Sequence, residues 1–382
     1  MLAACWSCAR EPARPELDRA LVARALATYA DIAAASYADA LGSARALQAA
    51  VERMLAAPSE ETLAAAREAW RVARKPYSLS EVYRFYDGPI DRVELLLNTW
   101  PIDENYVEGT PEGVERGVID DPTRFPTLEP VLLVSLNARD GETSISTGYH
   151  VLEFLLWGRD THDDGPGTRP ASDFVERADN PLAARRRRYL SLAAALLVQH
   201  LEPVAAAWRA GRADSYRAHF LALPAHEALG LALRGMGSLS GPELAGERLT
   251  VPYETRDQEN EHSCFSDSTH EDIVHDTLGV QNVCLGRYAG QGGRALRGVG
   301  LCDALASVDR GLATTLRAQV VASVAAARRI PAPFDRALAG ADDAPGRAAI
   351  KQTIVALEGV TRTLAKLAAR LGVGLSAAQA AR

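Results

Sequence analysis

The class of the fold is set by one stretch near the end of the chain, Arg347-Ala-Ala-Ile-Lys-Gln-Thr-Ile-Val-Ala-Leu-Glu-Gly-Val-Thr-Arg-Thr-Leu-Ala-Lys-Leu-Ala-Ala-Arg-Leu371. A series of its apolar side chains recurs at intervals of 4, 3, 7, 3 and 4 residues: Ile350, Ile354, Leu357, Leu364, Leu367 and Leu371. This spacing places them along one face of an α-helix, as in the seam of a helical bundle. No stretch alternates with period two for long enough to require a sheet, so the sequence predicts an all-α protein.

Earlier parts of the chain show helical patterns of the same kind. Residues 16–57 are rich in alanine and predict one long helix, and residues 301–329 predict another. Between 57 and 62, Pro58-Ser59-Glu60-Glu61 supplies a break, a cap and an acidic first turn. Because this break is short, the helices that it joins are expected to be antiparallel neighbours at the start of an up-and-down bundle. Pro76 is expected to kink or end the second helix.

The length of the chain predicts two domains. Its 382 residues exceed the size at which a single hydrophobic core stops growing. We expect an N-terminal tether over residues 1–15, a first helical bundle over 16–170 and a second over 180–375, packed side by side.

The charge balance and the hydropathy exclude two classes of protein. The net charge of -7 argues against a nucleic-acid partner, which would require a basic face. The sequence has no run of 18 or more apolar residues, so no segment is expected to span a membrane.

One helical stretch carries polar groups that an ordinary core helix would lack: Ile145-Ser-Thr-Gly-Tyr-His-Val-Leu-Glu-Phe-Leu-Leu-Trp-Gly158. His150 and Glu153 are three residues apart, and therefore on one face of a helix that Ser146 or Thr147 could cap. The other residues are apolar, so the pair is expected at a dry interface, where it must bond to itself, to a cation or to other polar groups. Gly148 would allow a backbone or a ligand to approach closely. The alternative is a histidine–glutamate hydrogen bond that only joins two helices.

A second polar cluster lies between residues 259 and 276. Such density of polar side chains requires a hydrogen-bond network or a function; its members are Glu259, Glu261, His262, Ser263, Asp267, Thr269, His270, Asp272 and His275. The alternative is a capping cluster followed by exposed helix charges.

Both stretches resemble the signatures of one family. The run Gly148–Gly158 resembles the G-x-H-x-x-E signature of the imelysin-like family, also called the imelysin peptidase or iron-regulated protein A family. Residues 260–272 resemble the family's second signature, and residues 279–288 resemble the segment after that signature. The runs 84–91 and 100–104 match its first-half pattern. The resemblance implies two helical bundles with the G-x-H-x-x-E site near their interface.

The residues of the first signature suit metal binding better than peptide hydrolysis. A zinc peptidase needs about three protein ligands, an open position for water and a general base. Its usual helical motifs contain two histidines, and here the second is missing after Glu153. Imidazole and carboxylate together suit iron or zinc. We therefore expect His150 and Glu153 to be metal ligands, and to be catalytic only if the protein is a peptidase.

Further site candidates come from both halves of the chain. Those that could add a ligand are Glu81, Asp91, Asp103, Glu104, Asp267 and His270; the remaining candidates are Gly148, Arg84, Glu261, His262, Ser263, Cys264 and Ser266. The family resemblance implies a role in metal acquisition together with iron-uptake components. The favoured interpretation is therefore a protein that binds a metal ion, iron before zinc, or a small ligand in that role. The alternatives are a metal-dependent peptidase and a metal-free module that binds a ligand or a partner protein.

The first residues predict a place in the cell envelope. Leu2-Ala3-Ala4-Cys5 resembles a bacterial lipobox, although only Met1 precedes it. Our interpretation is that a signal peptide is missing from the sequence and that Cys5 is lipidated, which would anchor a periplasmic or outer-membrane lipoprotein. The alternative is a chance match. In an oxidising compartment one disulfide could form among Cys264, Cys284 and Cys302, but their spacing does not select a pair.

Overall fold

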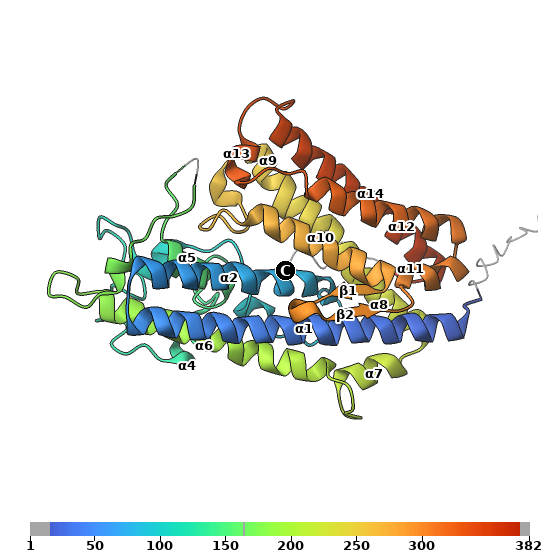
Figure 1. The fold of residues 1–382 in the computed structure, drawn as a ribbon, viewed down its shortest axis with the longest axis horizontal. Helices are drawn as coiled ribbons and strands as arrows, with labels where there is room; N and C mark the ends of the chain where they lie inside the picture. Colours follow the sequence, from blue (N-terminus) through green and yellow to red (C-terminus); the bar gives the residue numbers. More distant parts are fainter. Residues whose placement is uncertain (1–15, 163–164, 375–382) are drawn as a thin grey trace, which may run out of the picture.

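The computed structural model describes residues 16–162 and 165–374, and the elements of this part are almost all helices (Figure 1). The all-α prediction is therefore confirmed. The predicted tether with Cys5 lies outside the described residues.

The elements fall along the chain in two series. The first half contains α1 (Arg19–Ala56), α2 (Glu60–Ser80), α3 (Glu104–Glu108), α4 (Pro130–Leu136), α5 (Tyr149–Trp157) and α6 (Ala183–Trp208). The second contains α7 (Tyr216–Ala222), α8 (Ala225–Ser238), the π-helix η4 (Leu239–Thr250), α9 (Val251–Thr255), α10 (Thr269–Leu285), β1 (Arg287–Ala289), β2 (Ala295–Arg297), α11 (Leu301–Ala304), α12 (Arg310–Ala327), α13 (Phe334–Leu338) and α14 (Pro345–Leu371). Short 3-10 turns lie between them, among them η1 (Glu81–Tyr83).

The long helices begin where the sequence provides caps. The side chain of Asp18 accepts a hydrogen bond from Leu21 N at the start of α1. At α2, Ser59 and Thr62 form a reciprocal capping box after the break at Pro58. The two helices pack along each other, as the short break predicts.

The structure differs from two expected helix boundaries. Pro76 does not end α2, which continues to Ser80 because the residues around Pro76 are buried and held by tertiary packing. The other expected outcome, a kink at Pro76, stays a prediction. The single helix expected over 301–329 is divided into α11 and α12, because the side chain of Asp309 caps a new helix at Leu312 N.

The seam of α14 is buried as its spacing predicts. Each of its six seam residues is at most 4% exposed. This face packs against α12, α8 and η4, while α10 packs against α12 and also against α2 (Figure 1). The contact between α2 and α10 joins the earlier helices to the later ones.

Helix α6 packs along α1 and also touches α5. By length and composition it is the one helix in the described ranges that could cross a membrane. Because 61% of its most apolar window is buried inside the protein, the pattern is that of a core helix.

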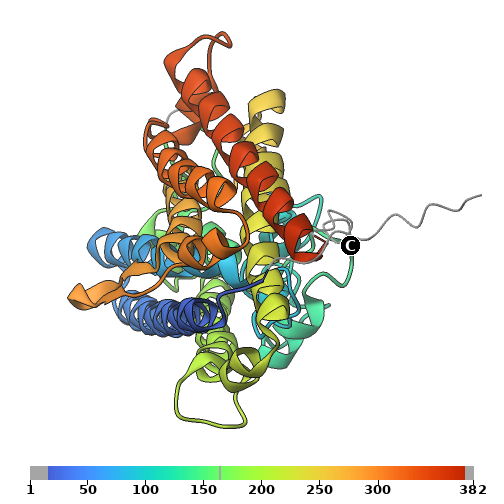
Figure 2. The same ribbon diagram turned by 90° about the vertical axis from the view of Figure 1, so that its right-hand side faces the viewer.

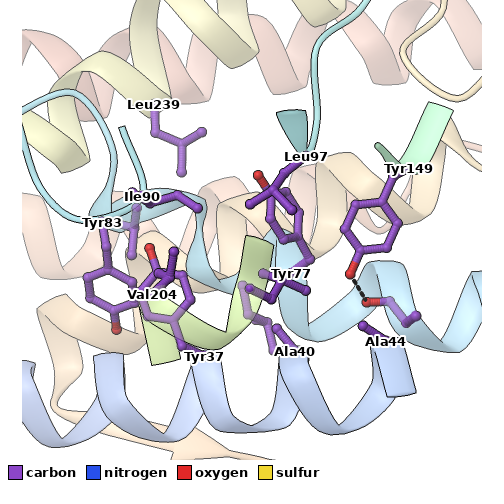
Figure 3. Packing of buried hydrophobic residues seen from close by; sticks show 14 of the residues in the cluster. Tyr37, Ala40, Ala44, Tyr77, Tyr83, Ile90, Leu97, Tyr149, Val204 and Leu239 are labelled. Atoms are coloured by element: carbon purple, nitrogen blue, oxygen red, sulfur yellow. Dashed lines mark hydrogen bonds between the residues drawn. The ribbon is translucent and has the colours of Figure 1, made fainter. Parts of the chain in front are cut away.

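Buried tyrosines and aliphatic side chains pack over α1 (Figure 3). Tyr77 and Tyr149 lie above Ala40 and Ala44 of α1, with ring centroids 4.9 Å apart. The small alanines allow the rings to approach α1 closely. Tyr149 follows Gly148 directly, so this packing fixes the first turn of α5.

The two short strands form an antiparallel hairpin that extends from the body of the protein (Figure 2). A disulfide between Cys284 and Cys302 closes the segment that contains it, and Cys264 is a buried free thiol. The disulfide expected among the three cysteines is thus present, with a pairing that the sequence did not select.

Candidate functional site

Helix α5 begins at a point where two backbones touch. Gly148 has φ +98°, and a Cβ built on it would lie 2.6 Å from the carbonyl oxygen of Leu97. Tyr149 N donates to that same oxygen at 2.8 Å. The expected close approach at Gly148 is therefore made by another backbone. The expected cap was wrong, because Ser146 and Thr147 donate their hydroxyl groups to the carbonyls of Leu133 and Leu96 instead.

His150 and Glu153 form a fully buried pair. His150 Nδ1 lies 3.0 Å from Glu153 Oε2, and the two side chains are 1% and 0% exposed. The other carboxylate oxygen, Oε1, accepts hydrogen bonds from Ser266 N and Oγ at 2.9 and 2.7 Å. The second ring nitrogen of His150, Nε2, is buried and has no hydrogen-bond partner in the described part of the chain. The first signature thus binds the second through Ser266 and leaves one nitrogen free.

Burial decides the charge of this pair. It raises the pKa of Glu153 to about 8, although the Ser266 hydrogen bonds oppose the rise. Burial also holds the pKa of His150 well below its usual value, helped by the nearby His262 ring. At neutral pH the proton therefore lies on the Glu153 carboxyl, which donates it to Nδ1.

His262 repeats the arrangement of His150. Its ring centroid lies 4.6 Å from that of His150, and its Nδ1 lies 2.8 Å from Asp272 Oδ2. Burial and the charge of Arg248 lower the pKa of His262 to about 4, so the ring is neutral and Nδ1–H donates to the carboxylate. The lone pair of His262 is then on Nε2. Two imidazoles, each backed by a carboxyl group, lie in contact.

Asp272 is the centre of a hydrogen-bond network in the second signature. It accepts from Arg74 Nε and Nη2 at 3.2 and 3.0 Å, and from Ser263 Oγ at 2.6 Å. Burial alone would raise its pKa, but Arg74 and His262 hold the pKa well below the usual range. Asp272 therefore stays ionised and fixes the tautomer of His262.

A chain of buried polar groups links this network to Glu81. Arg74 Nη1 donates to Asn98, and Asn98 Nδ2 donates to Glu81 Oε1 at 3.2 Å. Arg248 bonds both oxygens of Glu81, at 3.1 and 2.7 Å, and also Asp276 at 2.8 Å. Arg84 pairs with the other carboxylate oxygen of Glu81, Oε2. Glu81 is thus joined to the site through other residues, and Arg84 lies one contact further out.

Three candidate ligands are engaged in local structure instead. Asp91 accepts hydrogen bonds from backbone amides of residues 85, 86 and 88. Asp103 caps α3 through Asn105 N, and Glu104 lies 3.4 Å from Arg159. The structure does not bring these three carboxylates to His150.

Two further candidates of the second signature, Glu261 and Asp267, are buried acids. Glu261 is 1% exposed, and both of its carboxylate oxygens are buried without a hydrogen-bond partner among the described residues. Burial and neighbouring aspartates raise its pKa well above the usual value. Burial, with Asp335 and Asp160 nearby, also raises the pKa of Asp267 to about 7. Both acids therefore keep their proton to a higher pH than an exposed carboxyl group does.

A cleft of about 460 Å³ opens between α2 and the start of α10. Its walls include Arg71, Lys75, His270 and His275, and Ser266 lies in its lining. Since Ser266 also bonds Glu153, the cleft ends one hydrogen bond away from the buried pair. His150 and Glu153 are absent from the lining.

The arrangement meets part of what a metal ion requires. Metal-binding histidines usually donate one ring N–H to a carboxylate and bind the metal through the other nitrogen. His262 has this arrangement with Asp272, and His150 adopts it when Glu153 releases its proton. However, within residues 16–162 and 165–374 no three His, Cys, Asp or Glu side chains are grouped to hold a metal. The described residues offer two neighbouring imidazoles, so an ion bound there would keep further ligands of its own.

Comparison with known proteins identifies the family of the chain. The family model for imelysin matches residues 33–364. The chain belongs to the imelysin family. Iron-regulated protein A of Synechococcus elongatus is 24% identical over 308 residues, which are 78% of this chain and 72% of that protein.

Two crystal structures have the same imelysin fold. A protein described as an iron-regulated protein A precursor from Parabacteroides distasonis aligns with a TM-score of 0.70 and 20% identity, over 94% of this chain and 97% of that one. An imelysin-like protein from Psychrobacter arcticum aligns with a TM-score of 0.67 and 17% identity, over 96% of this chain and 100% of that one. The agreement over nearly whole chains shows that the helical architecture is that of the family.

Several residues of this imelysin-family site were not among the sequence candidates. Arg74, Asn98, Asp272 and Arg248 form most of its hydrogen bonds. Asp272 belongs to the polar cluster seen in the sequence. Arg74 is a charged residue of α2, two positions before Pro76. The signal for Asn98 and Arg248 lies only in their three-dimensional contacts.

Proposed function

We propose that the protein binds a metal ion, iron in preference to zinc, and that His150 Nε2 is its first protein ligand. The observation that carries this proposal is the buried, unpartnered Nε2 of a histidine whose other nitrogen is bonded to Glu153. A buried polar atom without a partner costs about 1–3 kcal/mol, and a metal ion bound at Nε2 would remove this cost.

His262 is the second ligand in this proposal. Its Nδ1 is held by the ionised Asp272, which leaves Nε2 with the lone pair that a metal requires. Glu153 and Asp272 then act behind the ligands, orienting the rings. This differs from the sequence hypothesis, in which Glu153 was itself a ligand.

The geometry supports binding rather than peptide cleavage. Glu153 is completely buried and its pKa is raised to about 8, so it holds a proton at the pH where a general base would need to be free. The cleft beside the pair is lined by Ser266 but not by His150 or Glu153, so a peptide in it would not reach them.

The choice of iron and of the cell envelope rests on two further observations. The curated relative is named for regulation by iron, and imidazole ligands suit ferrous iron as well as zinc. The Cys284–Cys302 disulfide suits an oxidising compartment such as the periplasm. We propose that lipidation at Cys5 anchors the protein there, where it would deliver metal to iron-uptake components.

The experiment is elemental analysis of the full chain, followed by titration of the metal-free protein with ferrous iron and with zinc. Glu153→Gln is the decisive variant. Its side-chain amide would donate to His150 Nδ1 as the protonated carboxyl does, so the fold is kept while Nε2 is fixed as a donor. We expect near-stoichiometric binding by the wild type, a loss of affinity of about 10–100-fold in Glu153→Gln, and at least as large a loss in His150→Ala.

The matched control is His200→Ala. His200 is also buried, and its Nδ1 has no partner among the described residues, but no carboxylate backs the ring. Its replacement should leave metal binding unchanged. Equal affinity in wild type and both site variants would overturn the proposal. Chelator-sensitive peptide cleavage that disappears in Glu153→Gln would establish the peptidase instead.

A further inference from the structure

The hairpin of β1 and β2 places like charges opposite each other. Arg287 lies opposite Arg297 in the register of the two strands, and both side chains are exposed on the outward face of the hairpin. Arginines directly opposite on neighbouring strands repel each other and destabilise the pairing. A hairpin of two three-residue strands is marginally stable, so it has little stability to lose.

The charged residues of the hairpin are all positive. Residues 287–298 contain three arginines and no acidic residue, in a protein with a net charge of -7. Arg294, with a side chain 52% exposed, lies 3.8 Å from Asp39. Arg287 and Arg297 have no ion pair in the described part of the chain. Their charges are therefore open to an external partner.

The structure holds this cationic element in place. The disulfide between Cys284 and Cys302 closes the segment at its base. On the inward face Tyr288 is buried, and its hydroxyl donates to Asp39 Oδ2 of α1 at 2.8 Å. The hairpin extends away from the helices (Figure 2). It is thus a presented surface rather than a loose loop.

We propose that Arg287, Arg294 and Arg297 dock the protein on an anionic membrane surface. Between the arginines the outward face offers only Ala289 and Ala295, followed by a glycine-rich turn, so it lacks the aromatic anchors typical of protein interfaces. A diffuse layer of anionic headgroups requires only positive charge on the protein surface that it attracts.

The position of the chain's first residues supports a membrane as the partner of the hairpin. Helix α1 runs beside the hairpin, and a Cβ on Gly298 would collide with Thr28 Oγ1, which is near the start of α1. Fifteen residues precede the described part of the chain. Fully extended they would span about 50 Å, so an anchor within them could lie in the membrane that the hairpin contacts. The inference does not depend on the metal site.

The test is co-sedimentation of the full, unlipidated chain with vesicles, and the hairpin variant is Arg287→Gln/Arg294→Gln/Arg297→Gln. One set of vesicles is pure phosphatidylcholine, and the other contains equal parts of phosphatidylcholine and phosphatidylglycerol. The control variant, Arg177→Gln/Arg212→Gln/Arg362→Gln, removes the same charge from side chains that are 50–63% exposed elsewhere.

We expect binding to the anionic vesicles alone, weakening with added salt as the Debye length falls to about 8 Å. The partition coefficient should fall about 100-fold in the hairpin variant and change little in the control variant. Equal binding by the two variants, or no preference of the wild type for anionic vesicles, would overturn the proposal. Near-identical melting curves would show that all three proteins are folded.

Discussion

His150 Nδ1 and Glu153 Oε2 lie 3.0 Å apart in a pair closed to solvent, so one shared proton decides what the free nitrogen of the histidine can do. When the carboxyl group holds the proton, it donates to Nδ1, and Nε2 carries a hydrogen. When the carboxyl group is ionised, Nδ1–H donates to it, and Nε2 presents a lone pair. A cation at Nε2 therefore competes with the proton on Glu153.

Glu153→Gln is expected to stabilise the protein at alkaline pH. The folded state raises the pKa of Glu153 from 4.5 to about 8, so the folded protein binds a proton that the unfolded chain releases. The stability contributed by this proton is complete below about pH 4.5 and is lost as the pH rises toward 8. Glutamine keeps the hydrogen bonds without titrating. Urea unfolding should give similar free energies for both proteins at pH 4.5, and an advantage for the variant that grows to at most about 5 kcal/mol above pH 8.

Ser266→Ala provides the control for this pH dependence. It removes the hydroxyl donor to Glu153 Oε1 but keeps the titrating carboxyl group, so the pH dependence should remain. A constant difference between wild type and Glu153→Gln across this pH range would show that Glu153 is ionised in the folded protein.

Gly148→Ala is expected to destabilise the protein by about 2 kcal/mol or more. Its φ of +98° disfavours a side chain, and the added Cβ would meet the carbonyl of Leu97, which already bonds Tyr149 N. Gly42→Ala is the matched control: Gly42 is an exposed position in α1 with nothing within 4 Å of its Cβ. That change should stabilise the protein by about 0.5–1 kcal/mol. Thermal unfolding measures both, and a stabilising Gly148→Ala would contradict the backbone contact.

The features that could be predicted from the sequence are those that local spacing encodes. The seam of α14, the capping box at Ser59 and the shared face of His150 and Glu153 each depend on residues within a few positions of one another. The residues that complete the site depend on distant contacts. Ser266 is 113 positions from the carboxylate that it bonds, and Arg74 is 198 positions from Asp272.

The candidates that lie away from His150 have a local explanation as well. Asp91 and Asp103 were considered as ligands because they are acidic and lie in or near a matching motif. In the structure Asp91 accepts hydrogen bonds from backbone amides that precede it, and Asp103 accepts one from a backbone amide that follows it. A turn containing Gly88 and Pro89, and a helix start after Asp103, were the signals for capping. The domain boundary near 170–180 stays a prediction.

Replacing Arg248 is expected to destabilise the protein by about 3–5 kcal/mol. Its guanidinium group, 2% exposed, bonds Glu81 at the end of α2 and Asp276 of α10. Arg248→Met would leave Asp276 buried without its cation and Glu81 paired with Arg84 alone. Arg362→Met is the control, because Arg362 is 63% exposed and pairs only with Glu358 among the residues that the structure describes. Its effect should be below about 0.5 kcal/mol in denaturant unfolding. Equal effects of the two changes would show that the buried network does not hold α2 and α10 together.

The Cys284–Cys302 disulfide is expected to contribute about 3 kcal/mol, because it closes a segment with a sequence separation of 18 residues. The double variant Cys284→Ser/Cys302→Ser should unfold at lower denaturant concentration than the wild type. A reducing agent should lower the stability of the wild type but not that of the double variant. Cys264→Ser is the control, because Cys264 is a buried free thiol. The stability of the Cys264→Ser variant should still fall when a reducing agent is added, because this variant keeps the disulfide. Peptide mapping without reduction should recover residues 284 and 302 in one cross-linked species. A cross-link through Cys264 would contradict the pairing, and with it the closed base that presents the arginine hairpin.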